Sequence, residues 1–425
     1  MNVERVMLPV VQAIGARPRV SRVVFRFARW GDPFAPERFS WPYPIYDTMT
    51  ADGPVVYSRA YHQWFVSGHD EVLAVLRSPN ASTEALGRRL LGLSPYTKLN
   101  ETAIENFRRW LLVTDPPVHT RLRTAVSRAF TPKRIAELEP QVLSIADRLL
   151  DDVADRRSVD VVEAYTAALP INAIAAILGL PGDRWAWLRT SSTQIGQMLE
   201  AMDAFDPHEM NRTFDDLQSV FTELIAERRA EPRDDLISAL VADESRLDDD
   251  EVVSMISVLM FAGHETATGL LGNAIVALGR HPDQRRLLRD RPDLIDNAVE
   301  ELLRYDTTAQ FTGRNTIGPI EAGDVTIPAG ANVALMLGAA NRDRRRWPDA
   351  DVLRLDRPDP KPISFGHGIH HCLGAALARL EMRVGLPAFL DAFGDYDVAD
   401  DDVEWKRSHT LRGPTKLVVQ RPAAD

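Results

Sequence analysis

The most informative stretch of the chain is Phe365-Gly366-His367-Gly368-Ile369-His370-His371-Cys372-Leu373-Gly374, which holds the only cysteine among 425 residues. A thiolate just before a long helix is favoured by the helix dipole and by free backbone N–H groups. The three glycines allow the backbone to approach another group closely. The segment therefore predicts a loop on which a flat macrocycle can stack, with Cys372 facing it.

Three other interpretations of this stretch remain open from the residues alone. Covalent attachment of a c-type haem needs Cys-x-x-Cys-His, and the chain has no second cysteine. His367, His370, His371 and Cys372 could together hold zinc. A lone buried structural cysteine is the ordinary alternative in most proteins. Neither the zinc site nor the structural thiol explains the phenylalanine and the glycines.

The stretch resembles the haem-binding signature of the cytochrome P450 family, Phe-x-x-Gly-x-x-x-Cys-x-Gly, at every position. The resemblance implies a mainly α fold with a smaller β part, and haem b (iron protoporphyrin IX) buried between a long central helix and the cysteine loop. It implies that Cys372 is the axial iron ligand and that its thiolate pushes electron density to the metal. Phe365 would pack beside the thiolate, and backbone N–H groups toward Gly374 would bond the sulfur.

Residues 247–280 predict one long helix, with an acidic first turn that complements the helix dipole. Ala262-Gly263-His264-Glu265-Thr266 lies in its apolar middle and is similar to the family's oxygen-binding motif. The resemblance implies that Ala262 and Gly263 widen a groove, that Thr266 hydrogen-bonds dioxygen and that Glu265 relays protons. The alternative is that Thr266 bonds back to the carbonyl of Ala262 and that Glu265 is an ordinary exposed acid.

Asp115-Pro116-Pro117 predicts a helix start with Asp115 as the N-cap, and His119 and Arg123 follow on one helix face. By resemblance, both side chains bind a haem propionate, because carboxylates in an apolar pocket need cationic donors. Arg314 and His370 match further propionate contacts by position. Glu301 and Arg304 fit the family's Glu-x-x-Arg pair, which is structural and not catalytic.

The remaining pattern predicts one mainly helical domain over residues 31–425 and a basic, helical N-terminal extension over residues 1–30. Apolar residues recur at helical spacing in 133–154, 214–229, 293–305 and 374–393. Short β-type runs occur at 55–57, 64–66, 325–327, 333–337 and 405–419. Residues 80–112 look irregular and loop-like, with one helical patch.

Composition excludes several classes of protein. The net charge of −11 argues against nucleic-acid binding, which needs a basic surface. One cysteine cannot form an internal disulfide, so nothing indicates an oxidising compartment, and we expect a cytoplasmic protein. Residues 164–182 are uncharged, but Pro170, Asn172 and Pro181 favour a buried helix over a transmembrane segment.

The expected substrate is a lipophilic small molecule that reacts with dioxygen by hydroxylation or epoxidation. The expected pocket includes residues 81–112, 185–215 and 408–411, and the side chains of Val258, Phe261, Ala309, Gln310 and Phe311. By resemblance, a separate ferredoxin and its reductase supply electrons, and candidate docking charges are Arg121, Arg128, Arg344, Arg345 and Arg346. Peroxide-driven oxidation, oxidative coupling and a non-enzymatic haem sensor are the alternatives.

Overall fold

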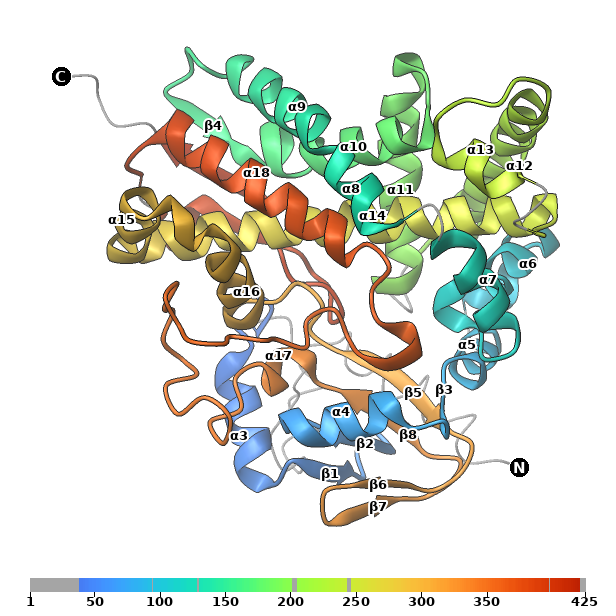
Figure 1. Cartoon of the computed structure of the whole chain (residues 1–425). Coiled ribbons are helices and arrows are strands. Elements are labelled where there is room, and N and C mark those ends of the chain that lie inside the picture. The colour runs from blue at the N-terminus through green and yellow to red at the C-terminus, as the bar shows by residue number, and fades with distance from the viewer. Residues whose placement is uncertain are drawn as a thin grey trace.

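A computed structural model describes residues 38–93, 95–127, 130–200, 205–242, 246–396 and 398–420. The predicted N-terminal extension, residues 1–30, lies outside the described residues. The fold is mainly α with a smaller β part, as the sequence predicts (Figure 1). Its long helices are α9 (Glu139–Asp151), α10 (Ala168–Leu178), α11 (Trp185–Glu200), α12 (Pro207–Ala230), α14 (Asp249–Arg280), α16 (Ile295–Tyr305) and α18 (Ala375–Phe393).

Helix α14 runs through the whole helical part of the molecule, and α10, α11 and α18 pack against it (Figure 1). It starts with a capping box, in which Asp248 accepts a hydrogen bond from the Glu251 N–H at 2.7 Å and Glu251 accepts one from the Asp248 N–H at 3.2 Å. Because the helix is apolar on nearly every side, it is stable only in the interior. The predicted helix 247–280 is thus confirmed.

The shorter helices connect this layer to the β part and cover its edges. They are α3 (Tyr43–Asp52), α4 (His69–Arg77), α5 (Glu84–Leu91), α6 (Glu101–Arg108), α7 (Val118–Ser127), α8 (Pro132–Glu137), α13 (Leu236–Val241), α15 (Pro282–Asp290) and α17 (Leu337–Ala340). The expectation of loops over residues 80–112 was wrong, since α5, α6 and two short 3-10 turns occupy this range. Their apolar positions are too few for a long periodic pattern, but they are enough to pack one face of a two-turn helix.

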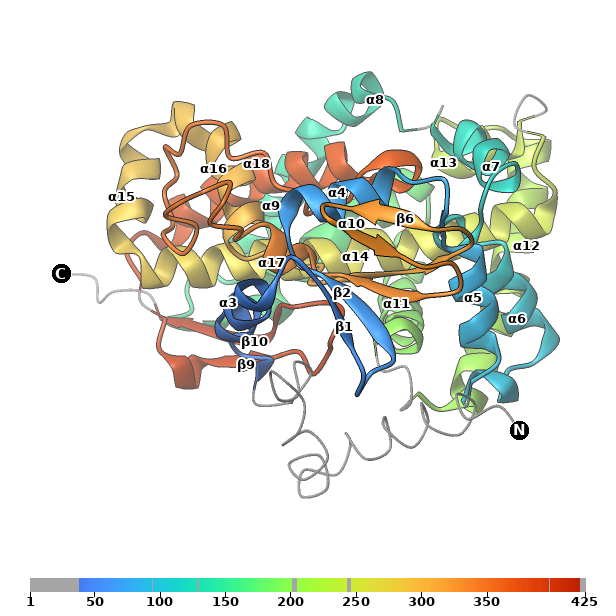
Figure 2. The same cartoon turned by 90° about the horizontal axis from the view of Figure 1, so that it is seen from below.

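The main sheet joins two distant parts of the chain, in the order β1 (Val55–Ser58), β2 (Gln63–Val66), β8 (Asn332–Leu335), β5 (Thr312–Thr316) and β3 (Ala81–Ser82). Strands β1 and β2, which contain the predicted β-type runs 55–57 and 64–66, form an antiparallel hairpin, and β2 pairs in parallel with β8 (Figures 1 and 2). Two smaller sheets consist of β4 (Ser158–Asp160), β10 (Pro414–Gln420) and β9 (Val403–Trp405), and of β6 (Ile320–Ala322) and β7 (Val325–Ile327).

Glu381 on α18 is a carboxyl group inside the helical core. It is 4% exposed, and its Oε1 has no hydrogen-bond partner among the described residues. Burial raises the pKa of Glu381 to about 8, because the charged form loses its hydration. The folded protein therefore keeps this proton at neutral pH, while the unfolded chain releases it near pH 4.

Glu381→Gln should remove a pH-dependent loss of stability. Between about pH 4.3 and pH 8 the folded state binds one proton more than the unfolded state, so this group lowers the free energy of unfolding as pH rises, by up to about 1.4 kcal/mol per pH unit. From pH 5 to pH 8, the melting temperature of Glu381→Gln should rise relative to that of the native protein. The melting temperature of the exposed control Glu223→Gln should show no such relative rise. If the melting temperatures of Glu381→Gln and the native protein changed with pH in parallel, Glu381 would not be a buried neutral acid.

Candidate haem site

The cysteine loop is fixed against α4 and against itself. The Cys372 N–H donates to the carbonyl of Phe365 at 2.9 Å, and the loop then enters α18. Gly368 has a φ of +72°, and a Cβ placed there would lie 2.5 Å from the carbonyl oxygen of Leu76 at the end of α4. Only glycine fits this close approach of two backbones. The loop before α18 thus has a defined shape and leaves Cys372 outside the regular helix.

Cys372 combines an exposed side chain with a partly desolvated thiol. Burial raises the pKa of the thiol, against the opposing effects of the Gly374 N–H, Arg123 and Arg379. A Cβ placed on Gly374 would meet nothing within 4 Å, so the backbone two residues after the cysteine borders open space. The protein alone does not favour the thiolate, whereas a bound metal cation would deprotonate it.

One face of α14 is accessible in an otherwise buried helix. Between Val252 and Gly279, every residue is buried except Leu259, Ala262, Gly263 and Thr266. Their spacing of i, i+3, i+4 and i+7 places them on one side of the helix. Gly263 lies at the edge of this face, since a Cβ there would meet Ile174 of α10 at 2.5 Å. Close packing on α10 therefore explains the glycine in the helix interior.

The two residues of the expected acid–alcohol pair lie in different surroundings. Thr266 donates to the carbonyl of Ala262, which is the back-bonding that the alternative interpretation describes. Glu265 is buried and is not an ordinary exposed acid, because its carboxylate accepts hydrogen bonds from Lys406 and, at 3.0 Å, from Thr193 of α11. Thr266 remains partly exposed on the accessible face.

The four residues expected to bind propionates gather close to Cys372. The rings of His119 and His370 have centroids 4.3 Å apart, and Arg123 and Arg314 both lower the pKa of His370, after the larger effect of burial. Arg123 also acts electrostatically on Cys372. The predicted residues from α7, β5 and the cysteine loop therefore form one cluster.

This cluster carries buried cationic and donor groups, and the nearby carboxylate of Asp115 acts electrostatically on Arg314, His119 and His370. Arg314 is 6% exposed, and burial lowers its pKa to about 10. It donates only to Thr312 and Gly313, and Nε2 of His119 is buried with no hydrogen-bond partner in the described part of the chain. Buried donors and cations in native proteins have partners. A ligand with carboxylates, such as a haem with its two propionates, fits these groups.

Asp115 acts differently from the expectation. It does not cap its own helix with its side chain. Its carboxylate accepts hydrogen bonds from Ser82 at 2.5 Å, from Thr83 N–H at 3.0 Å and from Glu84 N–H at 3.4 Å, so it caps α5. Thr83 in turn lies 3.2 Å from Nε2 of His370. Ser82 and Thr83 fall in the expected pocket stretch 81–112, but their contacts with Asp115 and His370 were not predicted, because neither residue stands in a recognisable motif.

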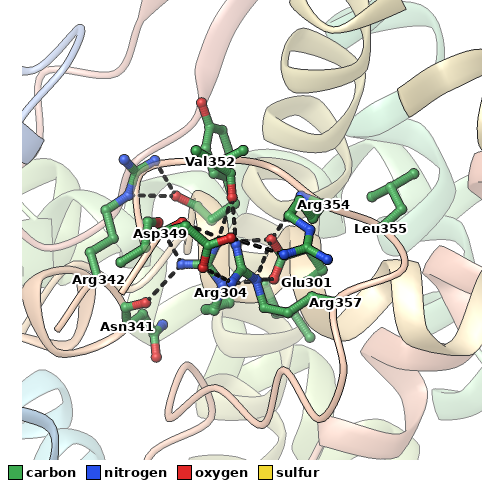
Figure 3. A network of polar contacts seen from close by, with 12 residues as sticks. Glu301, Arg304, Asn341, Arg342, Asp349, Val352, Arg354, Leu355 and Arg357 are labelled. Atoms are coloured by element: carbon green, nitrogen blue, oxygen red, sulfur yellow. Dashed lines mark hydrogen bonds and ion pairs between the residues drawn. The ribbon is translucent and has the colours of Figure 1, made fainter. Parts of the chain in front are cut away.

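A buried network fixes the chain that leads to the cysteine loop (Figure 3). Glu301 accepts hydrogen bonds from Arg304 at 2.7 and 2.8 Å and from Arg357 at 3.0 and 3.1 Å, and all three side chains are buried. Arg304 also donates to backbone carbonyls of Asn341, Ala350 and Val352. The expected structural pair is present, and Arg357 completes it as a third member.

The expected pocket residues are distributed over two regions. Val258 and Phe261 are buried, and Phe261 packs on Gly196 of α11. Leu259 and Ala262 occupy the accessible face, and the place of Val258 and Phe261 in the substrate pocket stays a prediction. Ala309 bridges to Leu411, whereas Gln310 and Phe311 lie against the cluster around α3.

Among the described residues, no group of three or more His, Cys, Asp or Glu side chains is arranged to hold a metal ion, so the histidines near Cys372 do not form a zinc site. No helix in the described ranges has the length and apolar character needed to cross a membrane.

Comparison with known proteins agrees with this geometry. The cytochrome P450 family model matches residues 182–419. Cytochrome P450 107B1 of Saccharopolyspora erythraea is 41% identical over 320 residues, which cover 74% of this chain and 77% of that protein. The 6-deoxyerythronolide B hydroxylase of the same organism is 35% identical over 391 residues, 89% of this chain and 95% of its own.

A solved structure extends the similarity to three dimensions. The crystal structure of P450BioI in complex with an acyl carrier protein ligated to hexadec-9Z-enoic acid superposes with a TM-score of 0.84 at 31% identity, covering 91% of this chain and 99% of that one. The long central helix, the cysteine loop and the order of the motifs match what the sequence predicts. The chain therefore belongs to the cytochrome P450 family, whose members are haem-thiolate monooxygenases.

Proposed function

We propose that this protein is a monooxygenase in which Cys372 ligates the iron of haem b and one atom of dioxygen enters a lipophilic small molecule. The observation that carries the proposal is the accessible face of α14, formed by Leu259, Ala262, Gly263 and Thr266. It places a hydroxyl on an open, otherwise apolar surface within a buried helix. A sensor without oxygen chemistry has no need for a buried acid next to this hydroxyl.

The residues around Cys372 would hold the cofactor. His119, Arg123, Arg314 and His370 would bind the propionates, because they supply buried cations and the unpartnered Nε2 of His119 beside Cys372. The haem, when bound, supplies the redox chemistry of dioxygen activation. Thr266 would orient dioxygen with its hydroxyl, and Glu265 would bring protons from solvent.

Electrons would come from a separate ferredoxin and its reductase. The structure describes the side chains of four of the five candidate docking arginines. Arg121 pairs with Glu251, Arg344 with Asp351 and Arg345 with Glu71 and Asp343, whereas Arg346 lies over the ring of Trp347. Arg128 lies outside the described residues. Arg121, Arg344 and Arg345 stay about half exposed despite these pairs, so a docking surface near them is electrostatically feasible.

The expected substrate stays at the level of a lipophilic compound. Apolar Leu259 and Ala262 line the open face, and the structurally similar P450BioI is seen with an unsaturated fatty acid. The cytoplasmic location inferred from the single cysteine also stays a prediction. A panel of lipophilic compounds, screened for a substrate-induced spin shift, would select the compound for turnover assays.

Thr266→Ala should uncouple electron use from product formation. Loss of the hydroxyl removes a hydrogen bond to dioxygen and a proton path, which is typically worth about 100-fold or more in rate. With NADH and a surrogate ferredoxin system, product per NADH should fall at least tenfold while NADH consumption continues and peroxide is released.

Thr268→Ala is the matched control, because Thr268 bonds back to the carbonyl of His264 in the same way but is buried on another face of α14. It should keep the product yield of the native protein. Equal yields from both variants would remove Thr266 from the reaction. A native protein that forms product with peroxide but never with NADH would favour the peroxide-driven alternative.

A further inference from the structure

The carboxylate of Glu265 is shared between two elements other than its own helix. Thr193 of α11 donates to Oε1 at 3.0 Å, and Lys406, directly after β9, donates to Oε2. We call this arrangement of Thr193, Glu265 and Lys406 the clasp. The side chain of Glu265 is 9% exposed and that of Lys406 is 21% exposed, so the lysine forms the solvent end of the clasp.

The ammonium group of Lys406 comes from a rigid segment. The Lys406 N–H donates to the carbonyl of Gly413 at 2.9 Å, and the guanidinium of Arg412 lies 3.8 Å from the ring centroid of Trp405. A Cβ placed on Gly413 would lie 2.7 Å from Cα of Gly269, so this segment touches the backbone of α14 one turn after Glu265. The lysine is therefore held at a fixed place beside the carboxylate.

The charges around the clasp favour an ionised Glu265. Burial alone would raise the pKa of Glu265, but Lys406 and then His264 outweigh it, and the pKa lies below its ordinary value. His264 itself is neutral near pH 7, because burial lowers its pKa to about 4. Arg189 on α11 and Arg412 beside the recess are further cations that face this region, and the charge of Arg412 is paired with the buried carboxylate of Asp306 at 2.7 Å.

An ionised carboxylate tied at both oxygens carries no proton to deliver. Efficient proton transfer needs a group whose pKa is near the working pH and which reaches its acceptor. In the clasp, the hydrogen bonds of Glu265 lead to α11 and to Lys406, whereas the Thr266 hydroxyl bonds to its own helix. A small recess beside the clasp is lined by both Glu265 and Lys406 and by Thr308, whose buried hydroxyl has no hydrogen-bond partner among the described residues.

We propose that Lys406 is a positioning residue, which holds Glu265 in the clasp as a resting state, and that protons reach Thr266 only when Glu265 leaves it. Outside the clasp, the carboxylate takes a proton from water, passes it on toward Thr266 and returns to Lys406 ionised. This proposal rests on the proposed function, because it assumes that Glu265 serves dioxygen activation. Its own content is the role of Lys406.

The clasp can be tested by stability without any turnover. In the native protein, the lowered pKa of Glu265 adds stability that is present above the unfolded pKa near 4.3 and lost as pH falls through the folded pKa. In Lys406→Gln, the largest effect that opposes burial is lost and only His264 and the Thr193 hydrogen bond remain, so the pKa of Glu265 should rise and the carboxylate should contribute less stability above about pH 4.3. The gap in melting temperature between the two proteins should thus widen from pH 5 to pH 8.

A double-mutant cycle identifies the partner. In a Glu265→Gln background, Lys406→Gln should have no pH-dependent effect on the melting temperature, and Lys406→Arg should restore the native pH profile. If Lys406→Gln changed the melting temperature by the same amount, and with the same pH dependence, in the native and the Glu265→Gln backgrounds, Lys406 would act on something other than Glu265. A Lys406→Gln profile parallel to the native one would also overturn the proposal.

Turnover then tests the functional part. The pH at half-maximal product yield per NADH should move upward by about 1–3 units in Lys406→Gln, since a cation within a few ångströms shifts a carboxyl pKa by about that much. Lys406→Arg should keep the native profile. If Glu265→Gln alone keeps the native yield and profile, the resting-state role is refuted while the monooxygenase function stands. If the native protein forms no product from any compound, the proposed function fails. The double-mutant cycle in melting temperature then still tests whether Lys406 holds Glu265.

Discussion

Cys372→Ser is expected to lower NADH-driven product formation by roughly 100-fold or more, since losing even the outer partners of a metal ligand costs about 10–100-fold. Serine has nearly the same shape, so the Cys372 N–H should still bond the Phe365 carbonyl and the loop should keep its shape. The hydroxyl does not supply a thiolate, and the electron donation that favours O–O cleavage is lost. Activity with a spin-shift-selected compound and a surrogate ferredoxin system measures the effect.

The matched control for Cys372→Ser is Ile369→Ser, an exposed position on the same loop. It should retain activity and haem content. If both variants lost activity equally, the loss would come from the loop and not from the sulfur. If Cys372→Ser kept the native rate, Cys372 would not be the ligand of the working enzyme.

Glu301→Gln should cost about 3–5 kcal/mol in the free energy of unfolding, because it removes the carboxylate that compensates buried Arg304 and one of the two carboxylates that pair with Arg357 in the described part of the chain. The network continues into the cysteine loop. Asn341 receives the Ile363 N–H at 2.8 Å, and Ser364 donates to the Leu303 carbonyl at 2.8 Å. We therefore expect a melting temperature lower by about 3–6 °C for a chain of this length, and a reduced haem content.

The neighbouring residue Glu300 provides a close control on the same helix. Glu300 pairs with Arg379, and both side chains are partly exposed, so Glu300→Gln should cost about 1 kcal/mol or less. Melting temperature and haem absorbance per protein measure both variants. Equal losses from Glu300→Gln and Glu301→Gln would show that the buried network does not support the loop.

The sequence predicted the parts of the site that stand in continuous motifs. The loop around Cys372, the helix of Thr266 and the cluster of His119 and His370 all lie where their motifs indicate. Motif and helix periodicity are local, so they can be read without a structure. The same reasoning named Ala262, Gly263 and Thr266 on α14 but not Leu259, which also lies on the open side. Periodicity defines the angle between residues but not the absolute rotation of a helix.

Contacts between distant segments could not be predicted. Asp115 caps α5 from 31 residues away, and Glu265 meets Thr193 and Lys406 across separations of 72 and 141 residues. An N-cap residue in a sequence is recognised by the helix that follows it, so Asp115 was assigned to the wrong helix. The clasp leaves no local pattern at all, because Lys406 stands in an ordinary strand-to-loop segment.

The central claim is that Cys372 binds haem iron as a thiolate, and the absorption spectrum of the reduced, carbon monoxide-bound protein tests it most directly. We predict a Soret band of the thiolate type in the native protein and its disappearance in Cys372→Ser. A native spectrum typical of histidine ligation, or a thiolate-type band that persists in Cys372→Ser, would contradict the assignment.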